Sequence, residues 1–296
     1  MAGLPAPFSI HVGSAYLSRW YGNCYLHSVM AFATWLPRRL FLGFAPIGHW
    51  IMEAGHLQGI QRRSTAPSAG RDVNEFWRKA LLVCGILSSL LYGAMIGAIG
   101  SEGYSRISQT PSELTAIGAP TRSLWMLLGA VYTVLVTAFG WGVWKSAGRD
   151  RALRIVGGLL VAYGSLGLLW PFAPMHQREV LAAGGGTLSD TMHLVLATAT
   201  VLLMFVAMGV AASAFGKRFR VYSIASVAVL VAFGALTFWD APRVQANLPT
   251  PWIGLWERSN ISVFLLWVVV LAAGLWRTGT AEGETQHVSR ISVQDS

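Results

Sequence analysis

The chain has 296 residues, of which 54% are hydrophobic and only 12% are charged. Soluble domains carry about 25% charged residues, so this composition argues against a soluble globular protein and indicates a membrane protein. The formal net charge of +9 does not indicate nucleic-acid binding, because the basic residues lie at the ends of apolar segments rather than among aromatic residues on one polar surface.

The N-terminal part, residues 1–75, differs from the rest of the chain. Its two apolar stretches are separated by Arg38 and Arg39, and each is too short for a bilayer, which takes about 20 apolar residues to cross. They fit an aromatic-rich extension that lies in the membrane interface and ends in a polar linker, 61–74. The alternative is that translation starts at Met52 and that residues 1–51 are upstream sequence.

Six uncharged apolar segments follow within residues 76–277, each near the length that crosses a bilayer. In lipid every backbone polar group needs an internal partner, so these segments are expected to be helices. The sequence therefore predicts an all-α fold, an integral membrane six-helix bundle with short loops. The six segments are 80–100, 123–144, 155–174, 194–215, 221–239 and 261–276.

Loop charges predict the orientation of this bundle. The loops after the second and fourth segments, 145–154 and 216–220, are strongly basic, whereas acidic residues balance the basic ones in the other loops. Basic loops stay in the cytoplasm, so both termini are expected inside a bacterial inner (plasma) membrane. Residues 278–296 read as a disordered cytoplasmic tail.

Tryptophans and small residues add two expectations about the spans. Trp125, Trp170 and Trp239 lie at the predicted outer ends of segments, where tryptophans anchor a helix at the membrane interface. Small residues four apart, such as Gly93 and Gly97, predict positions where helices approach closely.

The outward loop 101–122 contains the signals of a short helix. Thr110 precedes a proline and stands three residues before Glu113, which matches a capping box. Gly118 then provides a stop signal. These residues predict a helix over roughly 111–117, lying on the membrane surface as a lid, with Glu113 as its capping residue or, alternatively, as a catalytic carboxylate.

The stretch between the third and fourth segments gathers ionisable residues. Asp190 and His193 are three residues apart, and His176 and Glu179 repeat this spacing. Two histidines with two carboxylates are ligands that Zn²⁺ takes, so the four residues are candidates for a divalent metal site. The alternative is that Ser189 or Asp190 caps the helix that follows.

The outward loops also supply candidates for catalysis and ligand binding. Arginines bind phosphate through paired hydrogen bonds, although pairing with Asp240, Glu257 or Glu179 is an alternative role for them. The ligand-binding candidates are Arg178, Arg243 and Arg258. The catalytic candidates are Glu113, His176, Asp190, His193 and Asp240.

Four stretches resemble a known family. "GYSRISQTPSELTAIGAP", "WPFAPMH", "SDTMH" and "LPTPWIGLWERSN" are similar to outer loops of the domain-of-unknown-function family 998, a family of bacterial multi-pass membrane proteins. The resemblance covers all six segments and leaves out the first 75 residues. It implies the membrane topology and brings no activity, so no catalytic role follows from it.

Two hypotheses about function remain open at this point. The first is an outward-facing polar site that binds or processes a lipid or small amphiphile, whether as an enzyme or as a binding protein. The second is a non-catalytic accessory or scaffold subunit with a membrane protein partner. In both, the protein sits in a lipid bilayer and no nucleic acid is involved.

Overall fold

The computed structural model describes residues 69–294, so the predicted interfacial extension and the question of residues 1–51 lie outside the described residues. Within 69–294 the structure is entirely helical, which confirms the predicted all-α fold. The elements are α3 (Ala69–Ala98), η1 (Pro111–Thr115), α4 (Arg122–Ser146), α5 (Arg151–Leu166), η2 (Gly167–Phe172), α6 (Arg178–Ala182), α7 (Leu188–Ala211), α8 (Lys217–Gln245) and α9 (Ile253–Gln294), where η marks a 3₁₀ helix.

In the part of the chain that the structure describes, six helices are long and apolar enough to cross a membrane, which confirms the predicted multi-pass bundle. The third span joins α5 to η2, so it ends in a 3₁₀ turn that contains Pro171. The spans are Asn74–Ala98, Arg122–Ser146, Arg151–Phe172, Leu188–Ala211, Lys217–Gln245 and Ile253–Arg277.

Both ends of the bundle carry more helix than the sequence predicts. The first helix begins at Ala69, inside the segment expected to be a linker. An ion pair of 2.7 Å between Glu75 and Lys79, one turn apart, stabilises this early part. At the other end α9 continues to Gln294, through the segment expected to be disordered, and no proline interrupts it there.

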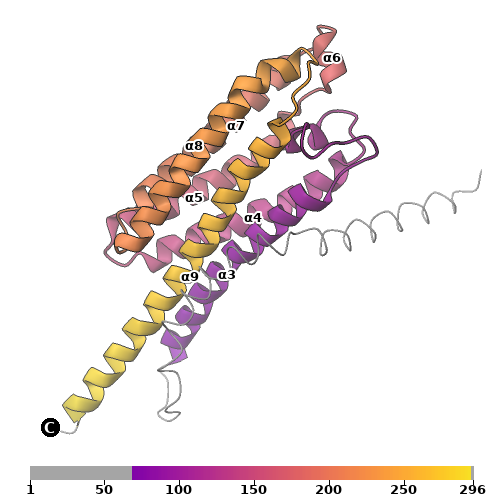
Figure 1. The fold of residues 1–296 in the computed structure, drawn as a ribbon. Helices are drawn as coiled ribbons and strands as arrows, with labels where there is room; N and C mark the ends of the chain where they lie inside the picture. The colour runs from indigo at the N-terminus through magenta and orange to yellow at the C-terminus, as the bar shows by residue number, and fades with distance from the viewer. Residues whose placement is uncertain (1–68, 295–296) are drawn as a thin grey trace, which may run out of the picture. The chain divides into compact units, whose positions relative to one another are not determined.

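The six spans form a closed ring in chain order. Each packs against the next, and α9 returns to pack against α3 (Figure 1). The ring is filled by fully buried apolar side chains, among them Phe139 of α4, Leu160 of α5 and Met208 of α7. Trp267 of α9 is also fully buried, and its indole N–H donates to Ser223 Oγ of α8 at 3.1 Å. This bond satisfies a donor that could not otherwise be buried.

The closest helix contact is between α4 and α5, and glycines make it possible. A Cβ atom on Gly157 would lie 2.6 Å from the backbone nitrogen of Trp144, and one on Gly140 would lie 2.6 Å from that of Val161. The expectation for Gly93 was wrong, because no atom lies within 4 Å of the position of its Cβ. Helices in lipid associate through such close backbone contacts, so this pair of helices forms a rigid unit.

We expect Gly157→Ala to destabilise the protein. The new methyl group would press against the backbone of α4, and overpacking of this kind costs about 1–3 kcal/mol. The midpoint of thermal unfolding of the detergent-purified protein should fall. Gly209→Ala in α7 is the matched control, because open space surrounds that position and alanine favours the helix. Equal midpoints for the two variants would contradict the close packing of α4 against α5.

Candidate functional site

One end of the bundle is covered by a cap, which consists of residues 99–121, 173–187 and 246–252 and includes η1 and α6 (Figure 1). A buried ion pair joins these three segments. Arg178 donates through Nε to Glu113 Oε1 at 2.5 Å and through Nη2 to Glu113 Oε2 at 2.9 Å. Its Nη1 donates to Thr250 Oγ1 at 2.8 Å, and its Nη2 also reaches the carbonyl of Ser108. The side chains of Arg178 and Glu113 are only 10% and 7% exposed.

Glu113 also caps η1, as the sequence predicts. Its Oε2 accepts from the backbone N–H of Thr110 at 2.7 Å, and its own backbone N–H donates to Thr110 Oγ1 at 3.3 Å. Gly118 has a φ of +83° and ends the turn. The predicted helix over 111–117 is therefore present as a shorter 3₁₀ helix. Its capping carboxylate serves the fold twice, first as the cap and then as the partner of Arg178.

A second arginine, Arg258, fastens α9 to the cap. It donates to the Tyr104 hydroxyl at 2.6 Å and to the carbonyls of Ile96, Arg106, Gln109 and Gly254. Burial raises the pKa of Tyr104 to about 12, against the lowering effect of Arg258. The phenol therefore stays protonated and donates to the carbonyl of Thr110 at 2.8 Å.

The three arginines predicted to bind a ligand thus differ in their surroundings. Arg178 and Arg258 are occupied within the cap, whereas Arg243 is exposed and donates to the carbonyl of Pro249 at 3.0 Å. The alternative prediction was that these arginines pair with an acidic residue. Arg178 does so, but its partner is Glu113 rather than Asp240, Glu257 or Glu179.

The four metal candidates do not form one cluster. Asp190 accepts from the backbone N–H of His176 at 2.7 Å and contacts His176 Nδ1 at 2.9 Å. His193 instead contacts the carbonyl of Ala173 through Nδ1 at 2.9 Å, and Glu179 is exposed. Across the described residues no group of three or more His, Cys, Asp or Glu side chains could hold a metal ion. The zinc hypothesis stays a prediction without support from these distances.

Asp190 has a structural role that the sequence predicts in part. Its Oδ2 accepts from the backbone N–H of Thr187 at 2.8 Å, so Asp190 belongs to the capping of α7. The N-cap is Thr187 rather than Ser189 or Asp190. Asp240, another catalytic candidate, is buried near the end of α8 and does not line the cavity described next.

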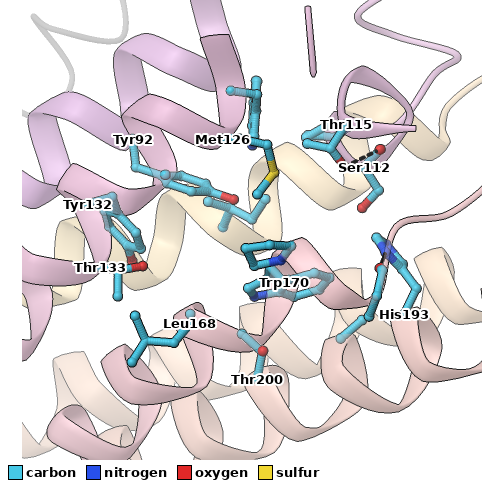
Figure 2. A pocket seen from close by; sticks show the side chains of 18 of the residues that line it. Tyr92, Ser112, Thr115, Met126, Tyr132, Thr133, Leu168, Trp170, His193 and Thr200 are labelled. Atoms are coloured by element: carbon cyan, nitrogen blue, oxygen red, sulfur yellow. Dashed lines mark hydrogen bonds between the residues drawn. The ribbon is translucent and has the colours of Figure 1, made fainter. Parts of the chain in front are cut away.

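A cavity of about 270 Å³ lies beneath the cap. Its walls come from α3, α4, α5 with η2, α7 and α9, while Ser112 and Thr115 of η1 close it from above. Figure 2 shows the Ser112, Thr115 and His193 side chains at one end of this space and those of Tyr132 and Thr133 at the other. Of the catalytic candidates, only His193 lines the cavity.

Aromatic rings form much of the cavity wall. Trp125 is only 6% exposed, and Trp170 meets the ring of His193 edge to face with centroids 4.9 Å apart. Deeper in the cavity the hydroxyls of Tyr132 and Tyr163 are 2.7 Å apart. Trp125 and Trp170 therefore belong to the cavity wall, whereas Trp239 is 82% exposed; interfacial anchoring stays a prediction for all three.

Two polar groups face the cavity with hydrogen-bonding capacity left over. A carbonyl only accepts, so His193 donates to Ala173 from Nδ1, and Nε2 of the neutral ring remains as an acceptor. Glu257 accepts from Ser112 Oγ at 3.0 Å through Oε1 only. Sequence reasoning missed Glu257 and Ser112 as site residues. The available signal was that Glu257, Asn260 and Ile261 share one helix face.

A model of the DUF998 family, described as a protein of unknown function, matches residues 82–274. The match includes the cap and all six spans in whole or in large part. No curated protein and no solved structure matches the chain.

We expect Arg178→Met and Glu113→Gln each to reduce stability strongly. Removing one partner of a buried ion pair leaves the other charge without compensation, which costs about 3–5 kcal/mol. The double variant should lose clearly less than the sum of the two single losses, and the free energy of unfolding in detergent measures this coupling.

Arg243→Met is the control for this cycle, because that arginine is exposed and should change stability by no more than about 0.5 kcal/mol. Strictly additive losses for the two single variants would show that Arg178 and Glu113 stabilise the cap independently.

Proposed function

This chain belongs to the DUF998 family of proteins of unknown function, and we propose that it binds a lipid or small amphiphile in the cavity beneath its cap. The observation that carries the proposal is the distribution of polar groups along the cavity. Arg122 at the start of α4, His193 near the start of α7 and Glu257 near the start of α9 all line it close to the cap. An amphiphile has the same division between a polar head and an apolar chain.

The deeper walls suit an apolar chain. Val136 from the middle of α4 and Val201 and Met204 from the middle of α7 line the cavity there. Most of the cavity lining is apolar, so burial of a hydrocarbon chain supplies most of the favourable free energy. The hydroxyl groups at this depth largely bond within the protein, as Thr200 does to the carbonyl of Leu196.

The cavity size favours a small ligand. Pockets for drug-sized ligands enclose about 300–1,000 Å³, and this cavity of about 270 Å³ lies just below that range. A single-chain amphiphile or one chain of a lipid fits this volume better than a complete two-chain phospholipid.

The position of Leu168 supports entry from the bilayer. Leu168 of η2 lines the cavity, yet it is 63% exposed on the outside of the bundle. At this position the third span changes from an α-helix to a 3₁₀ helix, and such changes often mark functional sites in helices. A chain could therefore pass from the surrounding lipid into the cavity beside Leu168 without crossing the cap.

The loop charges give the proposed direction of the site. The basic loops 145–154 and 216–220 connect spans at the end opposite the cap. The positive-inside rule then places the cap on the outer side of the plasma membrane, with both termini in the cytoplasm.

A cavity-filling variant tests the proposal. Gly129 lines the cavity and no atom lies within 4 Å of the position of its Cβ, so Gly129→Leu should fill the space without a backbone clash. The assay is photo-crosslinking of purified protein in zwitterionic nanodiscs with a diazirine-bearing long-chain alcohol, followed by peptide mapping. Crosslinks on α4 and α7 should fall at least about tenfold in the variant, equivalent to about 1.4 kcal/mol of binding free energy.

Gly93→Leu is the matched control. Gly93 is also a glycine within a span, with open space around its Cβ position, but it does not line the cavity. Crosslinks that persist in Gly129→Leu, or that fall equally in both variants, would refute the cavity as the binding site. Co-purification of one stoichiometric membrane partner in that case would favour the accessory-subunit hypothesis.

A further inference from the structure

We infer that the head group recognised in this cavity is an amine, held by Glu257 and Asn260 of α9 beside the rings of Tyr92 and Trp125. The inference rests on the proposed amphiphile site and adds the chemical class of its ligand. Glu257 and Asn260 are three residues apart, so they lie on one face of α9, and both line the cavity.

Glu257 forms no direct ion pair in the described part of the protein. Its Oε1 accepts from Ser112, and no ion pair there joins it to a lysine or arginine. The neighbouring Arg258 directs its guanidinium at backbone carbonyls and the Tyr104 hydroxyl. An ionisable group within a membrane span is costly and is by default a sign of function. A protonated amine would supply the missing positive charge.

Asn260 supplies a second acceptor on the same helix face. Its side chain is buried, and its Nδ2 donates to the carbonyl of Leu230 at 2.7 Å. This bond fixes the amide so that Oδ1 remains as the acceptor. An ammonium group carries three donors and no acceptor, which suits a site that presents a carboxylate and an amide oxygen.

The donors near the cap are largely used within the protein. Ser112 Oγ donates to Glu257, Thr115 Oγ1 donates to the carbonyl of Ser112, and Arg122 Nη1 donates to the carbonyl of Thr115 at 2.7 Å. His193 presents an acceptor, since its Nδ1 proton is directed at Ala173. Arg122 is the cationic donor group of the cavity lining, whereas Glu257, Asn260 and His193 offer acceptors, and these acceptors favour a donating head group over a carboxylate or sulfate on the α9 side of the cavity.

Two aromatic rings strengthen this assignment. Tyr92 and Trp125 both line the cavity and meet edge to face with centroids 6.2 Å apart. Both belong to a packed apolar cluster that includes Ile261, the residue next to Asn260. Indole and phenol faces attract ammonium ions, most strongly where water is excluded.

The test compares ligands that differ only in their head group. Wild-type protein in zwitterionic nanodiscs is labelled with the diazirine-bearing alcohol, and labelling is competed with dodecylamine, dodecanol or dodecanoate. We expect dodecylamine to compete at about ten- to a hundredfold lower concentration than dodecanol, the gain of a hydrogen bond to a charged group. Glu257→Gln should remove this advantage, so that dodecylamine and dodecanol compete at similar concentrations, because glutamine keeps the shape and can still accept from Ser112 but carries no charge.

Glu102→Gln is the control, since Glu102 is an exposed carboxylate in the same cap that does not line the cavity. Equal competition by amine and alcohol, or an amine advantage that survives Glu257→Gln, would overturn this inference while the amphiphile site stands. Labelling that does not depend on Gly129 would overturn the amphiphile site and the amine assignment together.

Discussion

The buried ion pair between Arg178 and Glu113 is the interaction on which the capped end depends. The cap is built from η1 and α6, which are five residues long each. Helices this short do not form alone in water, because the cost of starting a helix exceeds what so few hydrogen bonds return. The paired bonds of Arg178 to Glu113, with the further bond to Thr250, join three loops that are distant in sequence. Loss of this pair would leave η1 with its local capping box and the bonds to Glu257 and Arg122, but without its connection to the other two loops of the cap, and η1 forms the roof of the cavity.

The cavity below that roof follows from unequal packing around the ring of helices. Glycines such as Gly140 and Gly157 let α4 and α5 approach until their backbones touch. About three turns closer to the cap and on nearly the same face of α4, Gly129 by contrast faces open space in the cavity. Close contact along one part of this helix face and open space along another produce a pocket within an otherwise well-filled bundle. The same contacts explain its rigidity, since α5 is fixed to α4 along its whole length.

The sequence predicts the parts of this structure that local physics controls. The bilayer requires helices, so six apolar segments were enough to obtain the six spans. The capping box of Thr110 and Glu113 uses neighbouring residues only, and it was also predicted correctly. The partner of Glu113 could not be predicted, because Arg178 is 65 residues away in the chain and the sequence offered several acids for it.

The site residues were harder to predict for the same reason. His193 and Trp170 stand at helix ends, where capping and anchoring are the ordinary roles of such residues. Their place in the cavity depends on the angle at which α7 meets η2, and no local pattern contains that angle. Likewise, the spacing of Asp190 and His193 predicted that both side chains bind the same ligand. Instead, the carboxylate of Asp190 accepts a hydrogen bond from the backbone N–H of His176. The carboxylate of Asp190 therefore contributes to the capping of α7.

The depth of the charges in the bundle favours the proposed amphiphile site over a path for ions. In the described spans every Asp, Glu, Lys, Arg and His lies within the first or last few turns of its helix. Those that line the cavity, Arg122, His193 and Glu257, all start their helices at the capped end. A carrier for ions needs polar groups through the whole thickness of the membrane, whereas an amphiphile needs them only where its head group lies. The cavity places apolar walls below and hydrogen-bond acceptors above, and this order matches a molecule that stands in the bilayer with its head at the surface.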